Sequence, residues 1–217
     1  MKLLIVAATE GEIQPFLNWF NPTKYPVEVL ITGVGMVATA FAIGQKLNTK
    51  PFDMLLNVGI AGAFSQNTPL GSIFRVNEDC FAELGAEHGE QFISLDDLNL
   101  GSSSFNENLG TVLGLKAITH LPFAKSITVN QVHGNEVTIR KIQNRLSPDI
   151  ESMEGAAIFY AAKQAGIYAL QVRSISNIVE NRNKNNWDIP LAIQNLNKWL
   201  IEFVKEYSMN LSNLKNK

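Results

Sequence analysis

Residues 54–62 read MLLNVGIAG, a mostly apolar run that ends in a glycine-rich segment. A strand covered by helices on both faces of a sheet has such a continuous apolar run rather than an alternating pattern. In both directions from this run, strand-like apolar stretches alternate with helix-like stretches, which is the pattern of an α/β protein. We therefore predict an α/β domain in which residues 54–58 form a central, buried strand.

The other predicted elements continue this alternation. Further strands are expected at residues 3–7, 27–32, 72–76 with its continuation, 127–132, 149–153 and 168–175. Helices are expected at residues 12–20, 37–46, 136–146, 155–164 and about 191–207. Residues 84–110 are rich in glycine, serine and asparagine and predict a variable excursion from the fold. The chain thus predicts one domain at residues 1–209, followed by a frayed tail at 210–217.

The composition is that of an ordinary globular chain, with 217 residues, 46% hydrophobic content and a formal net charge of -2. At this charge there is no electrostatic reason to expect a nucleic-acid or anionic-membrane partner. The apolar run at residues 3–8 is too short for the core of a signal peptide. The longest nearly apolar stretch elsewhere, residues 54–64, is far below the roughly 20 residues of a membrane helix. We therefore expect a cytoplasmic protein.

Cysteine and histidine are sparse in this sequence. The single cysteine, Cys80, excludes an internal disulfide, and the three histidines are scattered rather than grouped as metal ligands. We predict neither a metal site nor a cofactor.

One motif suggests a nucleotide cofactor. Residues 33–38 read GVGMVA and fit the G-x-G-x-x-A dinucleotide fingerprint, with Asp53 twenty residues further on. The context does not fit, because the motif follows the second predicted strand and Asp53 precedes a strand instead of ending one. A tight turn, or a small contact to an anion or sugar, is the better interpretation.

Polar residues collect where the predicted strands end, which is where ligands bind in open α/β sheets. They are Glu10 and Glu12 after the first strand, the glycines of residues 59–62, the pair Met153 and Glu154, and Asn177. Each has a simple structural alternative when taken singly. Acids suit the first turn of a helix, and an asparagine suits a turn. His133 alone fits a loop residue, so no single residue decides the function.

Five segments taken together resemble one family. They are TEGEI at residues 9–13, TGVGMVA at 32–38, NVGIAG at 57–62, ESMEGAA at 151–157 and RSISN at 173–177. The set resembles the nucleoside phosphorylases and nucleosidases, the family that includes methylthioadenosine/S-adenosylhomocysteine nucleosidase, over nearly the whole chain. The resemblance implies a single-domain, nucleoside phosphorylase-like α/β fold, with a central mixed sheet flanked by helices. It also implies a purine nucleoside as small-molecule partner and a homodimer or higher homo-oligomer.

The resemblance also implies roles for single residues. Glu12 matches the carboxylate that activates the attacking water, and Asn177 falls where a side chain handles the purine N7, so both are predicted to be catalytic. Met153 and Glu154 match the ribose contacts, the glutamate holding the 2′ and 3′ hydroxyls. Val132 and His133 fall near the base-pocket wall, and Trp187 falls where an aromatic ring packs against the nucleoside. Gly59 is the remaining predicted substrate-binding residue.

The asparagine at position 177 departs from the adenine-specific relatives, which have aspartate there. Cleavage of the N-glycosidic bond develops negative charge on the base, so a group at N7 must stabilise it. A 6-aminopurine offers a donor at N6, which suits a carboxylate, whereas the O6 of a 6-oxopurine is an acceptor. An amide can donate to O6 and accept from a protonated N7. Asn177 therefore favours hypoxanthine or guanine as the base, and it leaves the source of the N7 proton open.

Within the family, the branch that combines Glu12 with this asparagine is futalosine hydrolase. The resemblance implies hydrolysis of futalosine to hypoxanthine and dehypoxanthine futalosine, a step of menaquinone biosynthesis. Futalosine carries an aromatic carboxylate at its 5′ end, for which Arg182, His133 and Lys184 are the candidate partners.

Three other functions compete with this one. A phosphorylase acting on 6-oxopurine nucleosides needs cationic groups for phosphate, whereas the first loop offers acids, with no arginine before Arg75. A nucleosidase acting on methylthioadenosine, S-adenosylhomocysteine or aminofutalosine is disfavoured by Asn177. A protein that only binds nucleosides has no need of Glu12.

Overall fold

The computed structural model describes residues 1–109 and 114–215. Its strands are β1 (Leu3–Ala7), β2 (Val27–Ile31), β3 (Met54–Ala63), β4 (Ile73–Phe81), β5 (Gly85–His88), β6 (Gln91–Ser94), β7 (Ser104–Asn106), β8 (Phe123–Thr128), β9 (Ile150–Ser152) and β10 (Tyr168–Ile178). Its helices are α1 (Glu10–Trp19), α2 (Met36–Thr49), α3 (Lys116–Thr119), α4 (Glu136–Leu146), α5 (Gly155–Ala165) and α6 (Ile189–Lys215), with a 3-10 turn at Lys184–Asn186. The predicted α/β class and the mixed sheet are confirmed.

The main sheet has the order β10-β4-β8-β9-β3-β1-β2, and β10 also pairs with β3. Strands β3, β10, β4, β8 and β9 therefore close into a ring, while β1 and β2 extend the sheet beyond it. Strands β1, β2, β3 and β10 are parallel to one another, and β4 runs antiparallel to β10. The parallel strands end at the same edge of the sheet, where the candidate site lies.

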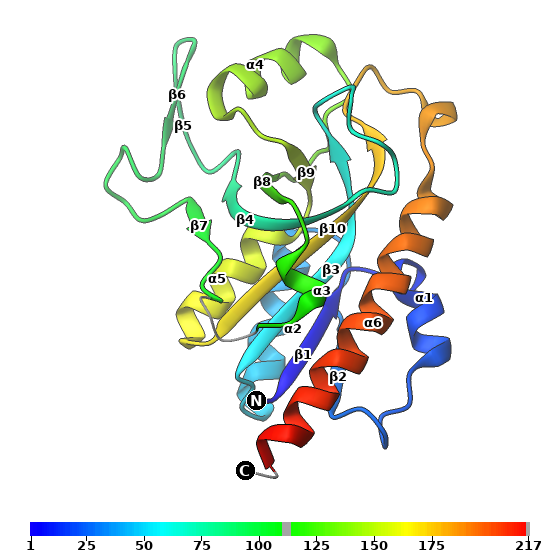
Figure 1. The fold of residues 1–217 in the computed structure, drawn as a ribbon. Coiled ribbons are helices and arrows are strands. Elements are labelled where there is room, and N and C mark those ends of the chain that lie inside the picture. The colour runs from blue at the N-terminus through cyan, green and yellow to red at the C-terminus, as the bar shows by residue number, and fades with distance from the viewer. Residues whose placement is uncertain (110–113, 216–217) are drawn as a thin grey trace.

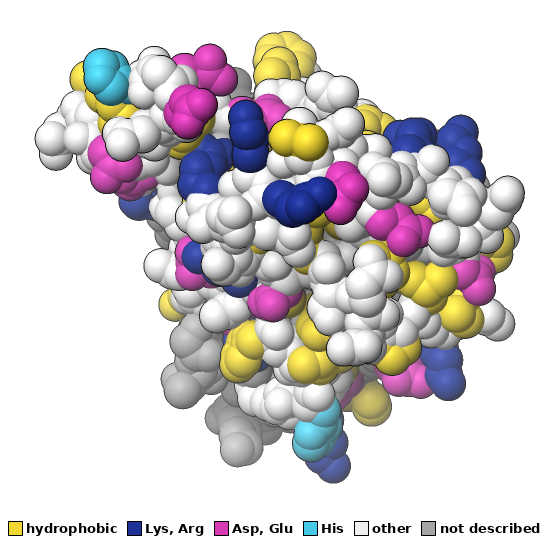
Figure 2. All heavy atoms as spheres, turned by 90° about the horizontal axis from the view of Figure 1, so that it is seen from above, with side chains coloured by type: hydrophobic (Ala, Val, Ile, Leu, Met, Phe, Trp, Pro, Cys, Tyr) yellow, Lys and Arg dark blue, Asp and Glu magenta, His cyan; other side chains and the backbone are white. Residues whose placement is uncertain are grey.

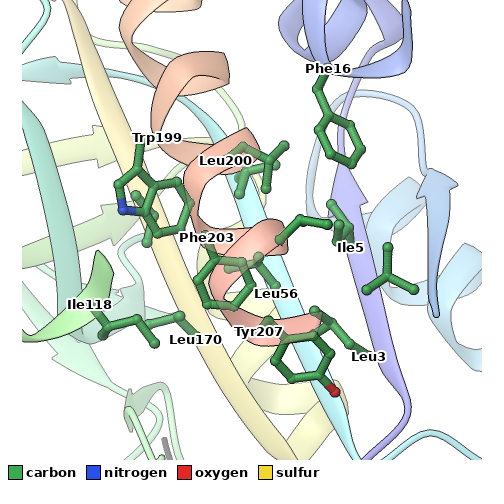
Figure 3. Close-up of a cluster of buried hydrophobic side chains, with 14 of the residues drawn as sticks. Leu3, Ile5, Phe16, Leu56, Ile118, Leu170, Trp199, Leu200, Phe203 and Tyr207 are labelled. Atoms are coloured by element: carbon green, nitrogen blue, oxygen red, sulfur yellow. The ribbon is translucent and has the colours of Figure 1, made fainter. Parts of the chain in front are cut away.

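Helices cover both faces of the sheet (Figure 1). Helix α6 packs with α1 over one face, and α2 packs with α5 over the other. Alternate residues of β1 point to opposite sides, so Leu3 and Ile5 join the core under α6 while Leu4 and Val6 join the core under α2 and α5. Figure 3 shows the first core, in which Trp199, Leu200, Phe203 and Tyr207 of α6 lie against β1, β3 and β10.

The structure changes several predicted boundaries. Residues 59–62, predicted as a flexible strand exit, remain in β3, where they pair with β10. The strand predicted at 127–132 is β8 and ends at Thr128, so residues 129–135 form a loop. The last helix continues to Lys215, well past the predicted end near residue 207 and into the segment predicted as a tail, whose residues 216 and 217 lie outside the described part.

The segment predicted as an excursion contains regular structure. Strands β5 and β6 pair as an antiparallel hairpin, and β7 pairs with the end of β4. In Figure 2, which looks down from above Figure 1, the hairpin side projects from the body of the molecule. The same face mixes acidic and basic side chains rather than gathering one sign of charge. Residue 110, the last of the predicted excursion, lies outside the described residues.

Within the described ranges, none of the helices has both the length and the apolar character needed to cross a membrane.

Candidate active site

The ends of β1, β3 and β10 meet the start of α5 at a cleft of about 510 Å³. All the predicted site residues except Gly59 line this cleft: Glu12, Val132, His133, Met153, Glu154, Asn177 and Trp187. The fold thus brings together side chains that lie up to 175 residues apart in the chain, as the position of the strand ends requires.

Glu12 is held rigidly at the start of α1. Its side chain accepts hydrogen bonds from the backbone N–H and the hydroxyl of Thr9, both at 3.1 Å, and the Glu12 N–H donates to the Thr9 hydroxyl at 3.3 Å. This is a capping box, so Glu12 also stabilises the start of the helix, as an acid in the first turn is expected to do. The second carboxylate oxygen accepts the Ile60 N–H at 3.1 Å. Helix start and strand end together aim one carboxylate into the cleft.

The helix is broken directly after Glu12. Ile13 leaves helical geometry (φ -121°, ψ 16°), and Pro15 has no N–H to donate within the helix. The side chain of Asn197 from α6 fills the gap, since its amide accepts from the Phe16 N–H at 2.9 Å and donates to the Glu12 carbonyl at 2.8 Å. A buried side chain of α6 therefore fixes the backbone that carries Glu12.

Glu154 lines the same cleft as the N-cap residue of α5. It is 6% exposed, and one carboxylate oxygen accepts the Gly35 N–H at 3.0 Å. Gly33 and Gly35 have φ of +85° and +96°, a region that favours glycine, so the GVG segment forms the predicted tight turn. That turn presents a backbone donor to Glu154.

A buried arginine lies beneath both carboxylates. Arg173 is 1% exposed and donates to the Asn57 side chain at 2.5 Å and to the Gln171 side chain at 3.0 Å. Its guanidinium also lies 3.9 Å from a carboxylate oxygen of Glu154. The positive charge offsets part of the repulsion between the acids of the cleft.

Gly59 permits this arrangement rather than lining the cleft. A Cβ added at Gly59 would collide with the Arg173 guanidinium and stand 2.9 Å from a carboxylate oxygen of Glu12. The position therefore requires glycine because two charged side chains pass directly over its backbone.

The Gln171 side chain leads from Arg173 to a second buried acid. Asp79 accepts hydrogen bonds from the Gln171 amide at 2.8 Å and from the Thr128 hydroxyl at 2.9 Å. Burial raises the pKa of Asp79 to about 6, against the lowering effect of these two donors and of Arg173. The Thr128 hydroxyl in turn accepts the Ala156 N–H at the start of α5, so the network secures the helix that carries Glu154.

Asn177 lies in β10 and not in a turn. The register between β10 and β3 shifts between Ile175 and Asn177, which is a bulge at Ser176. The Asn177 amide accepts from the Ser176 hydroxyl at 2.8 Å and donates to the Ile178 carbonyl at 3.1 Å. One lone pair and one N–H of the amide remain for a ligand in the cleft.

His133 forms a close pair with Glu151. The imidazole Nδ1 lies 2.6 Å from one carboxylate oxygen of Glu151, and the His133 backbone N–H donates to the other at 3.0 Å. Glu151 is 3% exposed and also lines the cleft. From the sequence, Glu151 is expected to need a partner because it lies in a buried strand. The sequence does not show that this partner is His133, in the loop after β8.

The outer rim is formed by the segment after β10. The Arg182 guanidinium lies 5.2 Å from the centre of the Trp187 ring, and its backbone N–H donates to the Gly134 carbonyl at 3.2 Å. Val132 is 36% exposed on the facing loop. The rim thus combines apolar surface with one cation.

Sequence patterns did not point to Arg173, Asn197 or Glu151 as parts of the site. Arg173 belongs to the RSISN segment, which was the signal available in the sequence. Its buried position, however, depends on the pairing of β10 with β3 and β4. Groups of three or more acidic, histidine or cysteine side chains able to hold a metal are absent from the described residues.

Comparison with known proteins gives consistent results. No family model matches the chain. It is 29% identical over 197 residues to the futalosine hydrolase of Thermus thermophilus, covering 86% of this chain and 85% of that one. It is 28% identical over 172 residues to the futalosine hydrolase of Streptomyces coelicolor, covering 76% and 73%.

Solved structures share the fold. A methylthioadenosine/S-adenosylhomocysteine nucleosidase of Streptococcus pneumoniae gives a TM-score of 0.79 at 18% identity, covering 95% of this chain and 100% of that one. A futalosine hydrolase mutant of Helicobacter pylori gives 0.78 at 16% identity, covering 95% and 99%. These comparisons confirm the resemblance read from the five segments. The chain has the nucleosidase fold, and its sequence is similar over most of its length to the futalosine hydrolases.

Proposed function

We propose that this protein hydrolyses the N-glycosidic bond of futalosine, releasing hypoxanthine and dehypoxanthine futalosine for menaquinone biosynthesis. The observation that carries the proposal is the cleft that Glu12 and Glu154, each fixed by a backbone donor, line together with Asn177. The similarity to named futalosine hydrolases supports the same substrate.

Each side chain has a defined task in this reaction. Glu12 takes a proton from water as the oxygen attacks the anomeric carbon, and its charge stabilises the oxocarbenium character of the ribose. Glu154 accepts hydrogen bonds from the 2′ and 3′ hydroxyls and fixes the orientation of the sugar. The free N–H and lone pair of Asn177 match the O6 and the protonated N7 of hypoxanthine.

The charges of the cleft favour water over phosphate as the nucleophile. Its lining contains the carboxylates of Glu12, Glu151 and Glu154. Among the described residues of this lining, Arg182 is the sole lysine or arginine. Since the three acids outnumber the rim cation and the buried Arg173 that lies against Glu154, the charge of the site disfavours an anionic phosphate and suits a hydrolase.

Of the three candidates for the 5′ carboxylate, the geometry favours Arg182. His133 is engaged with Glu151, and Lys184 is not among the residues that line the active-site cleft. Arg182 lines both this cleft and a neighbouring polar cleft of about 780 Å³, so its guanidinium stands where a substituent leaving the ribose pocket would pass. Its planar fork suits a carboxylate.

The Arg182 assignment is tested by comparing two substrates. Arg182→Gln should lower kcat/KM for futalosine at least about 10-fold, the value of one charge-assisted hydrogen bond. Inosine, which lacks the carboxylate, should be cleaved as before. Lys184→Gln is the matched control and should leave both substrates unaffected. An equal loss on futalosine and inosine would remove Arg182 from carboxylate recognition.

The reaction itself is tested by following the free base. The protein is incubated with futalosine, inosine, aminofutalosine and methylthioadenosine, with and without phosphate, and the products are separated by chromatography. We expect hypoxanthine from futalosine without phosphate. Release that requires phosphate would make the protein a phosphorylase, and preferred release of adenine would make it an adenine-type nucleosidase.

We also propose that the protein is at least a homodimer. Helix α2 exposes Val37 (78%) and Phe41 (67%) beside Tyr160 of α5, which is 42% exposed. An apolar cleft of about 720 Å³ lies next to them, between these helices and the 81–105 segment. Contiguous exposed apolar surface of this kind marks protein interfaces.

Sedimentation velocity tests the oligomeric state. The protein should sediment as a dimer or larger species, and Val37→Glu or Phe41→Glu should shift it to monomer. Met209→Glu, at a position 61% exposed on α6, is the control. A wild-type monomer at micromolar concentration would contradict the proposal.

A further inference from the structure

His133 and Glu151 form a polar pair in the cleft that has no role in the reaction as described so far. Both residues line the cleft, and the pair is closed by two contacts of 2.6 and 3.0 Å. The Glu151 side chain is 3% exposed and the His133 side chain 13%. A carboxylate is sequestered here with a single imidazole, an arrangement that needs a reason beyond packing.

The pairing defines what the imidazole offers to a ligand. An ionised carboxylate accepts hydrogen bonds, so Nδ1 carries the proton that it shares with Glu151. The other ring nitrogen, Nε2, is then left for the cleft that His133 lines. When a proton is added to Nε2, the buried carboxylate lies against the resulting imidazolium and balances its charge.

The strand register places this pair next to Asn177. Gly62 of β3 pairs with Asn177 of β10 on one side and with Glu151 of β9 on the other. A Cβ added to Gly62 would stand 3.1 Å from the Asn177 amide nitrogen and 3.6 Å from the Cγ of Glu151. The Glu151 carboxylate and the amide proposed to meet the purine therefore flank the same backbone position.

We propose that His133, oriented by Glu151, is the general acid that protonates the departing purine at N7. This inference rests on the proposed function, because it names the proton source for that same reaction. His133 is the catalytic residue, and Glu151 is a positioning residue that acts through it.

The step is balanced as follows in atoms and charge. The C1′–N9 bond breaks and its electron pair passes into the imidazole ring of the base, while N7 takes the proton from Nε2 of His133. A water oxygen bonds to C1′ and its proton passes to Glu12. Hypoxanthine leaves neutral, and solvent returns the proton from Glu12 to His133.

The other polar groups of the cleft are less suited to this role. The amide of Asn177 has no proton to release, and an arginine such as Arg182 stays protonated. Glu12 receives the proton of water and Glu154 is committed to the ribose hydroxyls. Among the described residues that line the cleft, His133 is the sole histidine, the side chain type that changes protonation nearest to neutral pH.

Two charged side chains and one aromatic ring lie near His133. Glu151 faces it from β9, and Arg182 from the segment after β10 lies against its neighbour Gly134, with the Cβ of Arg182 3.2 Å from a Cβ built there. The Phe64 ring, at the end of β3, lies 6.4 Å from the imidazole.

The test compares two leaving groups. 4-Nitrophenyl β-D-ribofuranoside releases nitrophenolate, which needs no proton at neutral pH, whereas futalosine releases hypoxanthine, which does. His133→Gln should lower kcat for hypoxanthine release about 100-fold and change nitrophenolate release less than about 3-fold. His120→Gln, at the exposed residue directly after α3, is the control and should change neither.

The pH profile gives a second readout on futalosine alone. The wild-type kcat/KM should fall on the alkaline side as the acid loses its proton, and this limb should be absent from His133→Gln. Glu151→Gln should move the limb to lower pH, because an amide no longer balances an imidazolium, a shift that a merely structural role would not produce.

The remaining outcomes overturn the inference. Equal losses on both leaving groups would assign His133 a structural role, and a loss confined to KM would assign it to base recognition. An unchanged alkaline limb would also exclude it as the acid. A wild-type protein that releases no hypoxanthine from futalosine refutes the proposed function itself, a result visible before any variant is measured.

Discussion

Glu10 and Glu12 both lie in the first turn of α1, where a negative charge interacts favourably with the helix dipole. They differ in what their side chains contact. Glu12 alone reaches the cleft, where it accepts from Ile60 and Thr9. Glu12→Gln should lower kcat for futalosine at least about 100-fold, because an amide cannot take the proton of water. Steady-state kinetics with Glu10→Gln as matched control separates this loss from a change of helix charge. Turnover close to wild type in Glu12→Gln would remove Glu12 from the mechanism.

Asn177 carries the choice of base. Asn177→Asp should shift the ratio of kcat/KM values towards 6-aminopurine nucleosides. A carboxylate accepts a hydrogen bond from the N6 amino group, but it cannot bond to O6, because both are acceptors. A mismatched buried polar pair costs on the order of 1–3 kcal/mol, or about 5- to 150-fold in the ratio. Competition between futalosine and aminofutalosine measures it. A constant ratio would mean that another group selects the base.

At the scale of residues, the sequence was informative wherever a side chain both belonged to a motif and faced the cleft. Glu12, Glu154 and Asn177 met both conditions. Partners were harder to predict, because the contact of Glu151 with His133 and that of Asn197 with Glu12 join residues 18 and 185 positions apart. Hydrogen bonds of that kind depend on tertiary geometry that no local pattern encodes.

Helix α1 shows how one element is completed by another. The break at Ile13 leaves the Phe16 N–H and the Glu12 carbonyl to the Asn197 side chain of α6. Asn197→Leu would leave both groups unsatisfied, at about 1–3 kcal/mol each, and would loosen the backbone under Glu12. We expect a lower free energy of unfolding together with a lower kcat.

Asn195→Leu is the control for this prediction. It removes a similar amide of α6, which donates to the Gly71 carbonyl at 2.9 Å and not to α1. This variant should lose stability and keep its kcat, as measured by urea unfolding and steady-state kinetics. A normal kcat in Asn197→Leu would show that Glu12 does not depend on the bridge.

Element types were predicted well because the apolar runs and helix stops are local signals. Gly166 directly follows the predicted helix at residues 155–164 and ends α5 in the left-handed region with φ of 65°, the usual place of a C-terminal glycine. Boundaries were less predictable. Strand β3 runs through Gly59 and Gly62 because these glycines admit Arg173 and Asn177 against its backbone, and a glycine-rich segment is locally indistinguishable from a strand exit.

The stability of the whole molecule should respond to pH through Asp79. Its pKa rises from 3.8 to about 6 on folding because of burial. The native state therefore holds the proton more tightly than the unfolded chain. The favourable contribution is complete below about pH 3.8 and is lost as the pH rises through about 6, a change of about 3 kcal/mol.

Two measurements check this prediction. The difference in free energy of unfolding between the wild type and Asp79→Asn should move in favour of the wild type as the pH falls from 7 to 4. Carbon-13 NMR of the Asp79 carboxyl group gives its titration directly, even if Asp79→Asn does not fold. Titration near pH 4 would contradict the prediction.

The position of β10 also governs the order in which the protein can be made. This strand pairs with β3 and with β4, although more than a hundred residues separate it from the first of them. A growing chain on the ribosome contains β3 and β4 long before residues 168–178 emerge. Until then, the backbone groups of β3 and β4 that pair with β10 have no partner in that strand. Non-local pairing of this kind is slow and exposes strand edges to other chains. Nascent molecules are thus most in need of chaperones just before β10 arrives, because its pairing closes the ring and brings Asn177 into the cleft.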